Sequence, residues 1–465
     1  MPEKYHIKSL PTQGRFRHVG KYGSVDWRED CARCSNCVKP RCVFDTYRKE
    51  AAYNRDPHTS IIPLYECRAC LSCVQGCTKG LLEISLNPEY LAMGDGYWKP
   101  DIMATTWNQA DTGRVPVSGA GYRGRFHGFG FDSIWTDMSE IVRPTRDGIH
   151  GREYISTSVD IGPKPMRLSF SNDGKLLGEP ASLIDLPLPL ILDVPSWQVG
   201  GQELARARLT AAAKLKTLAV ARAADVAGAP AAEMPFLIPL LGSEGLGEIQ
   251  SILPQVRMVE FVDSPEVSAL AGKAKATNSK LVIAVRLPLQ SAAAERILQL
   301  SRTGLKVFHL CADLHGCEVG VEKPRHLKDV MREIHGRLVR EGIRDEITLI
   351  VAGGIALAEH MAKAIICGAD LVAADTALLV ALGCRVCRGV QDADHQDHCP
   401  AEVPKLESAY AVQRMVNLMA AWHSQLLEVL GAMGIREVRR LRGEVGRAIF
   451  KEDVEREAFG DLLPR

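Results

Sequence analysis

The sequence lacks an excess of charge of either sign and lacks any long apolar segment. Its 57 Lys and Arg residues against 56 Asp and Glu residues leave a formal net charge of +1 over 465 residues. Non-specific nucleic-acid binding needs surplus cations that neutralise phosphates, so this balance argues against a nucleic-acid-binding protein. No uncharged apolar run approaches the ~20 residues that a membrane-spanning helix needs. The first 20 residues contain no apolar signal core, so we expect a cytoplasmic protein without a membrane span.

Cysteine is absent from a long central stretch and concentrated outside it. Of the 14 cysteines, eight lie between positions 31 and 77, none between 78 and 310, and three between 384 and 399. Without a secretion signal, clustered thiols of this kind indicate metal ligands rather than disulfides. Ordinary proportions of hydrophobic (46%) and charged (24%) residues predict a folded chain, and its length suits two or three domains.

Two cysteine motifs near the N-terminus have the spacing of iron–sulfur ligands. They are Cys31-x2-Cys34-x2-Cys37-x4-Cys42 and Cys67-x2-Cys70-x2-Cys73-x3-Cys77. Three thiolates at two-residue spacing can bind three corners of one [4Fe–4S] cluster, and the more distant fourth cysteine reaches the neighbouring cluster. The pattern predicts one cluster on Cys31, Cys34, Cys37 and Cys77, and a second on Cys67, Cys70, Cys73 and Cys42.

Two adjacent clusters of this kind would conduct electrons rather than catalyse a reaction. The alternative is a pair of zinc sites, although zinc usually takes separated CxxC pairs that give four tetrahedral ligands.

Eight short apolar runs alternate with helical patterns in the second half of the chain. We expect strands at 189–194, 218–221, 236–241, 258–262, 281–287, 307–311, 347–352 and 371–374, and helices at 203–214, 291–301, 326–340 and 357–367. This alternation predicts an α/β fold, a parallel (β/α)8 barrel. An open doubly wound sheet would show the same alternation, but no GxGxxG follows the first strand.

These patterns divide the chain into four segments. We expect a ferredoxin-like module with two [4Fe–4S] clusters at 1–95, an irregular segment packed on the barrel at 96–182, the barrel with a cysteine-rich segment at 183–405, and a C-terminal helical segment at 406–465. Low Leu and Ile content and repeated turn signals are the reason to expect irregular structure between 96 and 182. The helical pattern from 407 to 450 should close the barrel or cover one of its faces.

A third cysteine group, Cys384, Cys387 and Cys399, follows the last barrel strand and its short helix. Three thiolates suit a [3Fe–4S] cluster, or a [4Fe–4S] cluster with a fourth ligand from elsewhere. His395 and His398 lie within the same segment, so a zinc site also stays open. Cys311 and Cys367 are expected to be buried free thiols.

The strand ends of the barrel offer candidate cofactor ligands. Strand seven ends in Gly353-Gly354, whose N–H groups can approach an anion closely, and strand eight leads to Asp375, Thr376 and Ala377 at a helix start. A tight turn would explain the two glycines equally well. Arg286, on strand five, could stabilise the negative charge of a reduced flavin, or could be a surface ion-pair partner.

Several of these segments resemble the FMN-binding synthase domain of glutamate synthases. The similar residues are 343–354, Gly368-Ala-Asp370, Thr376-Ala377, 381–400, Arg414-Met-Val-Asn417 and 427–443. The resemblance covers about 185–450, and with the N-terminal module the chain resembles the short, archaeal-type members. It implies a barrel that binds FMN through the strand-end residues named above, beside an iron–sulfur cluster on the third cysteine group. In that family the flavin reduces 2-iminoglutarate, so the resemblance implies an oxidoreductase that passes electrons from clusters to FMN and on to a small imino or oxo acid.

The chain also departs from that family at several positions. The glycine-rich segments expected after strands two and six are replaced by 227–230 and by 313–318, and Asp375 stands where glycine is common. No glutaminase domain is expected in a chain of this length that begins Met1-Pro2. These departures leave an alternative open: a non-catalytic electron-transfer or scaffold subunit of a larger redox complex, with a degenerate flavin site.

Both functions need an electron source outside the chain. We expect a ferredoxin or partner redox subunit, within an oligomer or complex. A small acidic substrate would suit the enzyme, and the arginine-rich stretch at 139–152 could help to bind it.

Overall fold

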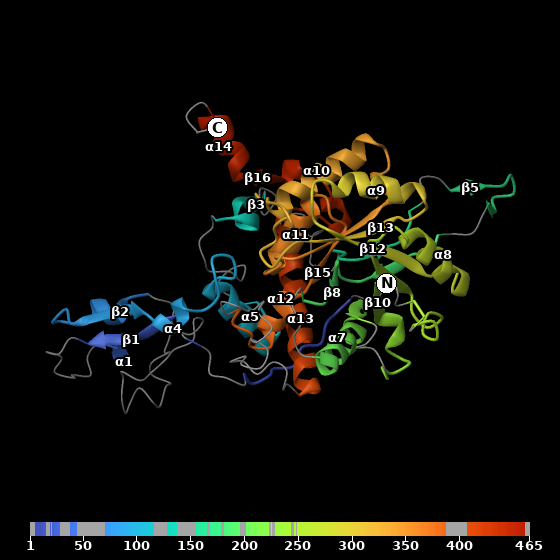
Figure 1. The fold of residues 1–465 in the computed structure, drawn as a ribbon. Helices are drawn as coiled ribbons and strands as arrows, with labels where there is room; N and C mark the ends of the chain where they lie inside the picture. Colours follow the sequence, from blue (N-terminus) through green and yellow to red (C-terminus); the bar gives the residue numbers. More distant parts are fainter. Residues whose placement is uncertain are drawn as a thin grey trace.

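The centre of the molecule is a closed barrel of eight parallel strands. The computed structural model describes residues 5–14, 19, 21–27, 38–43, 70–115, 128–136, 155–164, 168–177, 181–195, 201–222, 225, 228–242, 246–247, 249–386 and 407–460. The strand order around the barrel is β10-β11-β12-β13-β14-β15-β8-β9. Figure 1 shows the barrel strands with helices around them. The strands are β8 (Leu190–Leu192), β9 (Ala219–Arg222), β10 (Leu237–Leu241), β11 (Met258–Val262), β12 (Val282–Pro288), β13 (Val307–Cys311), β14 (Thr348–Ala352) and β15 (Leu371–Ala374). The predicted (β/α)8 barrel is confirmed.

Closure of the barrel depends on the short strand β8, which joins the last strand to the second. The N–H of Asp193 donates to Ala374 on one side at 2.8 Å, and the N–H of Leu192 donates to Leu218 on the other at 2.9 Å. Both neighbouring strands are parallel to β8. An open sheet would leave these groups unpaired at an edge, so the doubly wound alternative is excluded.

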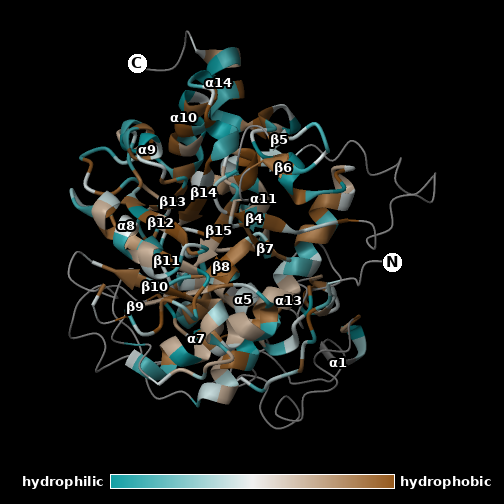
Figure 2. Ribbon diagram, turned by 90° about the vertical axis from the view of Figure 1, so that its right-hand side faces the viewer, coloured by the Kyte–Doolittle hydropathy of each residue, from teal (hydrophilic) through white to brown (hydrophobic). Residues whose placement is uncertain are grey.

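Helices cover the outside of the barrel and hide the apolar strands. They are α7 (Gly201–Leu215), α8 (Val267–Thr277), α9 (Ala293–Arg302), α10 (Leu327–Arg340), α11 (Ala358–Ile366) and α12 (Thr376–Ala381). Figure 2 shows hydrophobic strands in the interior and hydrophilic residues on the outward helix faces. Strands with both faces covered in this way are almost continuously apolar, as β14 and β15 are. Within the described ranges, no helix has both the length and the apolar character needed to cross a bilayer.

The long helix α13 (Ser408–Ala432) holds distant parts of the chain together. It packs against α7, α11 and α5 (Pro100–Thr112). The side-chain amide of its buried Asn417 donates to the carbonyls of Leu10 at 2.7 Å and Ala110 at 2.8 Å. Arg414 donates to Ala381 at 2.5 Å and forms an ion pair with Asp111. The N-terminal segment, α5 and α12 therefore meet on α13.

The predicted C-terminal helical segment is α-helical over 451–459 as well, but its first helix ends at residue 432. Beyond it the chain forms η10 (Val438–Leu441), η11 (Val445–Arg447), strand β16 (Ala448–Phe450) and helix α14 (Lys451–Phe459). β16 pairs antiparallel with β3 (Ile134–Thr136), which follows η3 (Gly130–Ser133). Gly434, with φ of 69°, lies just past the helix end, where a left-handed residue commonly terminates a helix.

The prediction of irregular structure for 96–182 is wrong for α5. Pro100 begins this helix and Gly113, with φ of 67°, ends it, both favourable at those positions. The hydroxyls of Thr105 and Thr106 donate hydrogen bonds to the backbone carbonyls four residues earlier. Low intrinsic helix propensity is overcome because most of α5 is buried and the helix packs against α12 and α13. Between β3 and β8 the described strands form two antiparallel pairs, β4 (Val159–Ile161) with β7 (Ile184–Leu186) and β5 (Ser169–Phe170) with β6 (Leu176–Leu177).

The N-terminal part forms a small layer beside the barrel (Figure 1). Strand β1 (Tyr22–Trp27) pairs antiparallel with β2 (Leu82–Leu86), and the cysteine motifs lie between these strands in sequence. Two short helices, α1 (Val38–Arg41) and α3 (Ser72–Gln75), pack against each other, and α4 (Pro88–Leu91) leads toward the barrel.

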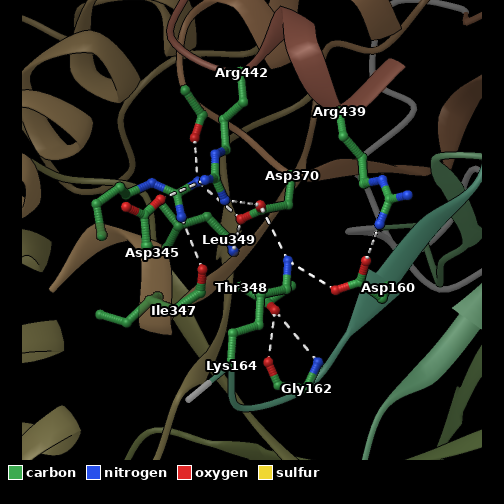
Figure 3. Close-up of polar contacts among 12 residues, drawn as sticks. Asp160, Gly162, Lys164, Asp345, Ile347, Thr348, Leu349, Asp370, Arg439 and Arg442 are labelled. Atoms are coloured by element: carbon green, nitrogen blue, oxygen red, sulfur yellow. Dashed lines mark hydrogen bonds and ion pairs between the residues drawn. The ribbon is translucent and has the colours of Figure 1, made fainter. Parts of the chain in front are cut away.

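A buried ion-pair network closes the end of the barrel where β14 and β15 begin. Figure 3 shows the carboxylate of Asp370 at its centre. Asp370 accepts from Arg344 and Arg442, each at 2.8 Å, and Lys164 lies 3.7 Å away. It also accepts from the backbone N–H of Leu349 at 2.8 Å. Burial alone would raise the pKa of Asp370, but these cations lower it to about 2. The network ties the loop after β4 and the C-terminal segment to the barrel.

We expect Asp370→Asn to destabilise the barrel by about 3 kcal/mol at neutral pH, because buried Arg344 and half-buried Arg442 would lose their counter-charge. The folded-state pKa of Asp370 is lower than its ordinary value of 3.8, so its contribution is complete above pH 4 and is lost as the pH falls toward 2. Thermal unfolding between pH 3 and 7 measures both effects. The matched control is Asp345→Asn, which removes an 85% exposed partner of Arg442 and should cost well under about 1 kcal/mol. Equal losses in the two variants would contradict the central role of Asp370.

Candidate active site and cluster segments

Four charged side chains meet inside the barrel at the carboxyl ends of its strands. Asp193 follows β8, Glu260 lies on β11, Arg286 on β12 and His309 on β13. Arg286 donates to Asp193 at 2.5 Å and forms a second ion pair with Glu260. His309 Nδ1 lies 3.0 Å from Glu260 Oε2. Asp193, Glu260 and His309 are each at most 2% exposed, so water cannot screen their charges.

The charges of this buried group determine the ionisation of its members. Burial alone would raise the pKa of Glu260, but Arg286 and His309 lower it to about 2. Burial alone would lower the pKa of His309, but nearby Cys311 and Glu260 raise it well above its ordinary value. Arg286 is thus at the barrel end where it was predicted, although its charge is balanced by two carboxylates. The surface ion-pair alternative is wrong, because those partners are buried.

The two glycines after β14 form a sharp turn packed against the β13 loop. Gly353 and Gly354 have φ of 90° and 66°, a region that side chains other than glycine rarely adopt. A Cβ on Gly353 would lie 2.6 Å from the Asp313 carbonyl, and one on Gly354 would lie 2.6 Å from the Gly316 nitrogen. The tight-turn explanation therefore holds. Within the described ranges no acceptor contacts either N–H, so both donors also stay free for an anion.

The start of α12 has one feature that suits a phosphate and one that opposes it. The Thr376 hydroxyl is buried and has no hydrogen-bond partner among the described residues. The carboxylate of Asp375, however, accepts from the Thr376 N–H at 2.5 Å, one of the donors predicted for a phosphate. Burial raises the pKa of Asp375 to about 6, so near neutral pH a small change of environment can protonate it. The residues therefore fit an FMN phosphate once the Asp375 charge is removed or turned aside.

Sequence reasoning missed several residues of this site. Tyr97 donates its hydroxyl to the Gly354 carbonyl at 2.5 Å, and burial raises its pKa well above the ordinary value. The indole N–H of neighbouring Trp98 donates to Leu314 at 2.9 Å. Residues that precede α5 thus cover the loops after β13 and β14, which no local pattern indicates. Glu260 and His309 did have a signal, because each interrupts an apolar strand, and buried ionisable groups often mark functional sites.

Five of the predicted cluster ligands lie in described segments: Cys42, Cys70, Cys73, Cys77 and Cys384. Hydrogen bonding from the Ser72 backbone lowers the pKa of Cys70, and the N–H groups of Leu81 and Lys79 lower that of Cys77. Backbone donors of this kind favour the thiolate, the form that binds metals and clusters. A Cβ on Gly76 would lie 2.8 Å from Arg41 Cγ, so the helix that precedes Cys42 touches the turn between Cys73 and Cys77.

The third cysteine segment contacts the polypeptide that leaves the N-terminal layer. Arg385 forms an ion pair with Glu89 at 3.0 Å, and its carbonyl accepts from the Gly94 N–H at 3.2 Å. Cys384, beside Arg385, is buried. The segment that follows β2 therefore lies against the segment that begins the third cysteine group.

Several predictions fall outside the described residues. They concern Cys31, Cys34, Cys37, Cys67, Cys387 and Cys399, together with His395, His398 and the stretch 139–152. Of the two expected free thiols, Cys367 is buried and Cys311 is partly buried at the end of β13.

Comparison with known proteins relates the chain to one family. Residues 327–436 match the family model described as a conserved region in glutamate synthase. The archaeal-type glutamate synthase [NADPH] of Dehalococcoides mccartyi is 23% identical over 90% of this chain and 93% of its own length. The archaeal glutamate synthase [NADPH] of Methanocaldococcus jannaschii is 27% identical over 75% of this chain and 81% of its own. The archaeal glutamate synthase [NADPH] of Archaeoglobus fulgidus is 23% identical over 96% of this chain and 98% of its own length.

Comparison with solved structures finds a mutant flavocytochrome b2. It covers 81% of this chain and 87% of its own, with 10% identity and a TM-score of 0.43.

We expect Gly354→Ala to destabilise the barrel by about 3 kcal/mol, because it combines left-handed strain with overlap against the Gly316 backbone. Gly320→Ala is the matched control: Gly320 has a similar φ of 72°, but its nearest neighbour would be 3.6 Å away. The control should cost only the strain, about 1 kcal/mol. Thermal unfolding of both variants compares the two costs, and similar values would show that the packing against 312–316 is unimportant.

Proposed function

We propose that this chain, a glutamate synthase-related protein of the short archaeal type, is an iron–sulfur flavoprotein oxidoreductase. Electrons would enter at two [4Fe–4S] clusters in the N-terminal layer, pass the third cysteine group and reach FMN at the barrel, where a small imino or oxo acid is reduced. The observation that supports this most is the free donor set at the barrel end: the N–H groups of Gly353 and Gly354 and the buried Thr376 hydroxyl.

The proposed electron route follows the contacts of the described segments. Cys70, Cys73 and Cys77 lie on and around α3, and the next strand leads through α4 to Glu89 and Gly94. Both of these residues bind Arg385, the neighbour of Cys384. A third cluster on Cys384, Cys387 and Cys399 would therefore stand between the N-terminal clusters and the barrel.

The barrel end has the groups needed to bind the phosphate and to orient a flavin. Gly353, Gly354, Thr376 and Ala377 would bind the phosphate, and Arg286 would provide a fixed cation near the ring. When bound, FMN supplies a hydride to the C=N or C=O bond of the acid. The two carboxylates that bind Arg286 prevent it from rotating, and the segment at Tyr97 limits access of water from one side.

The alternative function is a non-catalytic electron-transfer or scaffold subunit. The Asp375 contact with Thr376 N–H favours it, because an ionised carboxylate there repels a phosphate. The partner would in either case be a ferredoxin or a redox subunit, and the names of the relatives include NADPH. The division of the chain into four segments, with boundaries after residues 95, 182 and 405, is part of the same proposal.

Extraction of cofactors from anaerobically purified protein distinguishes the two functions. We expect released FMN, together with iron and acid-labile sulfide for two or three clusters. Cys70→Ser should remove one low-potential signal in electron paramagnetic resonance and slow reduction of the flavin by at least about tenfold, since the route would be broken. Cys367→Ser, a buried thiol outside all three groups, is the control and should change neither. A cluster-containing protein without flavin would favour the scaffold, and unchanged flavin reduction in Cys70→Ser would exclude the route.

The charge of Asp375 should make FMN binding depend on pH. Because its pKa is about 6, we expect the affinity of flavin-free protein for FMN to rise as the pH falls from 7.5 to 5.5. Asp375→Asn should bind FMN about tenfold more tightly at pH 7.5, which corresponds to ~1.4 kcal/mol of repulsion removed. Fluorescence titration measures both proteins. The FMN phosphate also titrates near pH 6, so the informative quantity is the difference between them, which should vanish at low pH. Equal affinities at pH 7.5 would show that Asp375 does not face the phosphate.

A further inference from the structure

We propose that Asp193, His309 and Cys311 bind one divalent metal ion, best matched by zinc, inside the carboxyl end of the barrel. This site goes beyond the redox proposal and requires neither the flavin nor the clusters. Its three donor atoms, a carboxylate oxygen, an imidazole nitrogen and a thiol sulfur, all lie within 4.8 Å of one another.

The fold brings these donors together from two strands that are not neighbours in the barrel. His309 and Cys311 are two residues apart on β13, so their side chains point to the same face of the strand. Asp193 follows β8, which β14 and β15 separate from β13 in the barrel. His309 Nε2 lies 3.7 Å from Asp193 Oδ2. Two donors each ~2.1 Å from a tetrahedral zinc ion are ~3.4 Å apart, so only a small movement is needed.

The hydrogen bonds around the three residues leave the ligand atoms available. Asp193 Oδ1 accepts from Arg286 at 2.5 Å and from the Val194 N–H at 2.7 Å, while Oδ2 faces the histidine. His309 Nε2 is buried and has no hydrogen-bond partner in the part of the chain that the structure describes. A buried imidazole nitrogen without a partner is costly unless something binds it.

The other nitrogen of His309 has the partner expected in a metal site. Nδ1 lies 3.0 Å from the Glu260 carboxylate, and Arg286 holds that carboxylate in place. Metal-binding histidines almost always donate their second N–H to a carboxylate or carbonyl, which fixes the ring and raises the basicity of the ligand. Glu260 is thus a positioning residue for the proposed metal ion.

The charges of the group also favour a divalent cation. Without a metal ion, protonated His309 balances the charges of Asp193, Glu260 and Arg286. A metal ion displaces that proton, and the two carboxylates and Arg286 are then left with one negative charge in a buried place. A dication bound to the Cys311 thiolate adds one net positive charge, so the assembly becomes neutral.

The ligand types select the metal and indicate what it can bind. Mixed thiolate, imidazole and carboxylate ligands suit zinc rather than magnesium or calcium, which prefer oxygen alone. Three protein ligands leave a tetrahedral zinc ion one position for water or for an oxygen of a small substrate. The carboxyl end of the strands is the usual place for substrate in a (β/α)8 barrel.

Zinc binding to the whole, cluster-containing protein tests this site. Protein with its full iron and sulfide content is treated with a mild chelator and equilibrated with Zn²⁺ under anaerobic conditions. We expect wild type to retain one zinc ion more than Cys311→Ala, and Asp193→Asn to bind that ion much more weakly. Glu260→Gln should weaken it by ~10–100-fold, as loss of an outer partner does. Cys367→Ala, a buried thiol away from the site, should bind zinc like wild type.

X-ray absorption at the zinc edge identifies the ligands without interference from iron. The expected shell contains one sulfur at ~2.3 Å and nitrogen or oxygen at ~2.0–2.2 Å, and the sulfur should disappear in Cys311→Ala. Thermal unfolding verifies that each variant is folded. Equal zinc content in wild type and Cys311→Ala would overturn the proposal, as would a shell of several sulfurs, which would place zinc in the cysteine motifs. Wild type without retained zinc would mean that His309 is instead protonated and paired with Asp193.

Discussion

Closure of the eight-stranded barrel is the constraint on which the rest of the structure depends. The short strand β8 pairs with β15 on one side and β9 on the other, and the loop after it begins with Asp193. Closure brings Asp193 within hydrogen-bond distance of Arg286, 93 residues away. Asp193, Glu260 and His309 are buried, so each must have a partner of opposite charge. Asp193, Glu260, Arg286 and His309 satisfy this condition among themselves, and the barrel end becomes a fixed polar group in an apolar shell.

The two ends of the barrel use buried charge differently. Where β14 and β15 begin, Asp370 is surrounded by cations from three other segments, and its negative charge fastens the outer chain to the barrel. At the opposite end, the His309 Nε2 and Thr376 hydroxyl are buried without a hydrogen-bond partner in the described structure, while Asp375 has a raised pKa. In the first arrangement the buried carboxylate has partners of opposite charge, and the network stabilises the fold. The second keeps unsatisfied donors and acceptors, which is what a ligand-binding end requires.

Helix α13 and the residues around Tyr97 connect the barrel to the N-terminal layer. Asn417 and Arg414 bind α5 and the N-terminal segment, and Tyr97 and Trp98, just before α5, contact the loops after β13 and β14. The Arg385 contacts with Glu89 and Gly94 lie on the same side. The proposed electron route and the proposed flavin site therefore depend on the same group of contacts between segments. Movement of α5 would affect both.

The sequence by itself determined the barrel, because eight apolar runs separated by helical patterns have few other ways to bury both faces of every strand. It also located the cysteine motifs, the Gly353–Gly354 turn and Arg286, since each is recognisable from residue type and spacing. Only the tertiary structure decided that α5 is helical, because its stability comes from burial against α12 and α13 rather than from propensity. Likewise, only closure of the barrel brought Asp193 to His309 and to Arg286, because such contacts depend on residues distant in sequence and leave no local pattern.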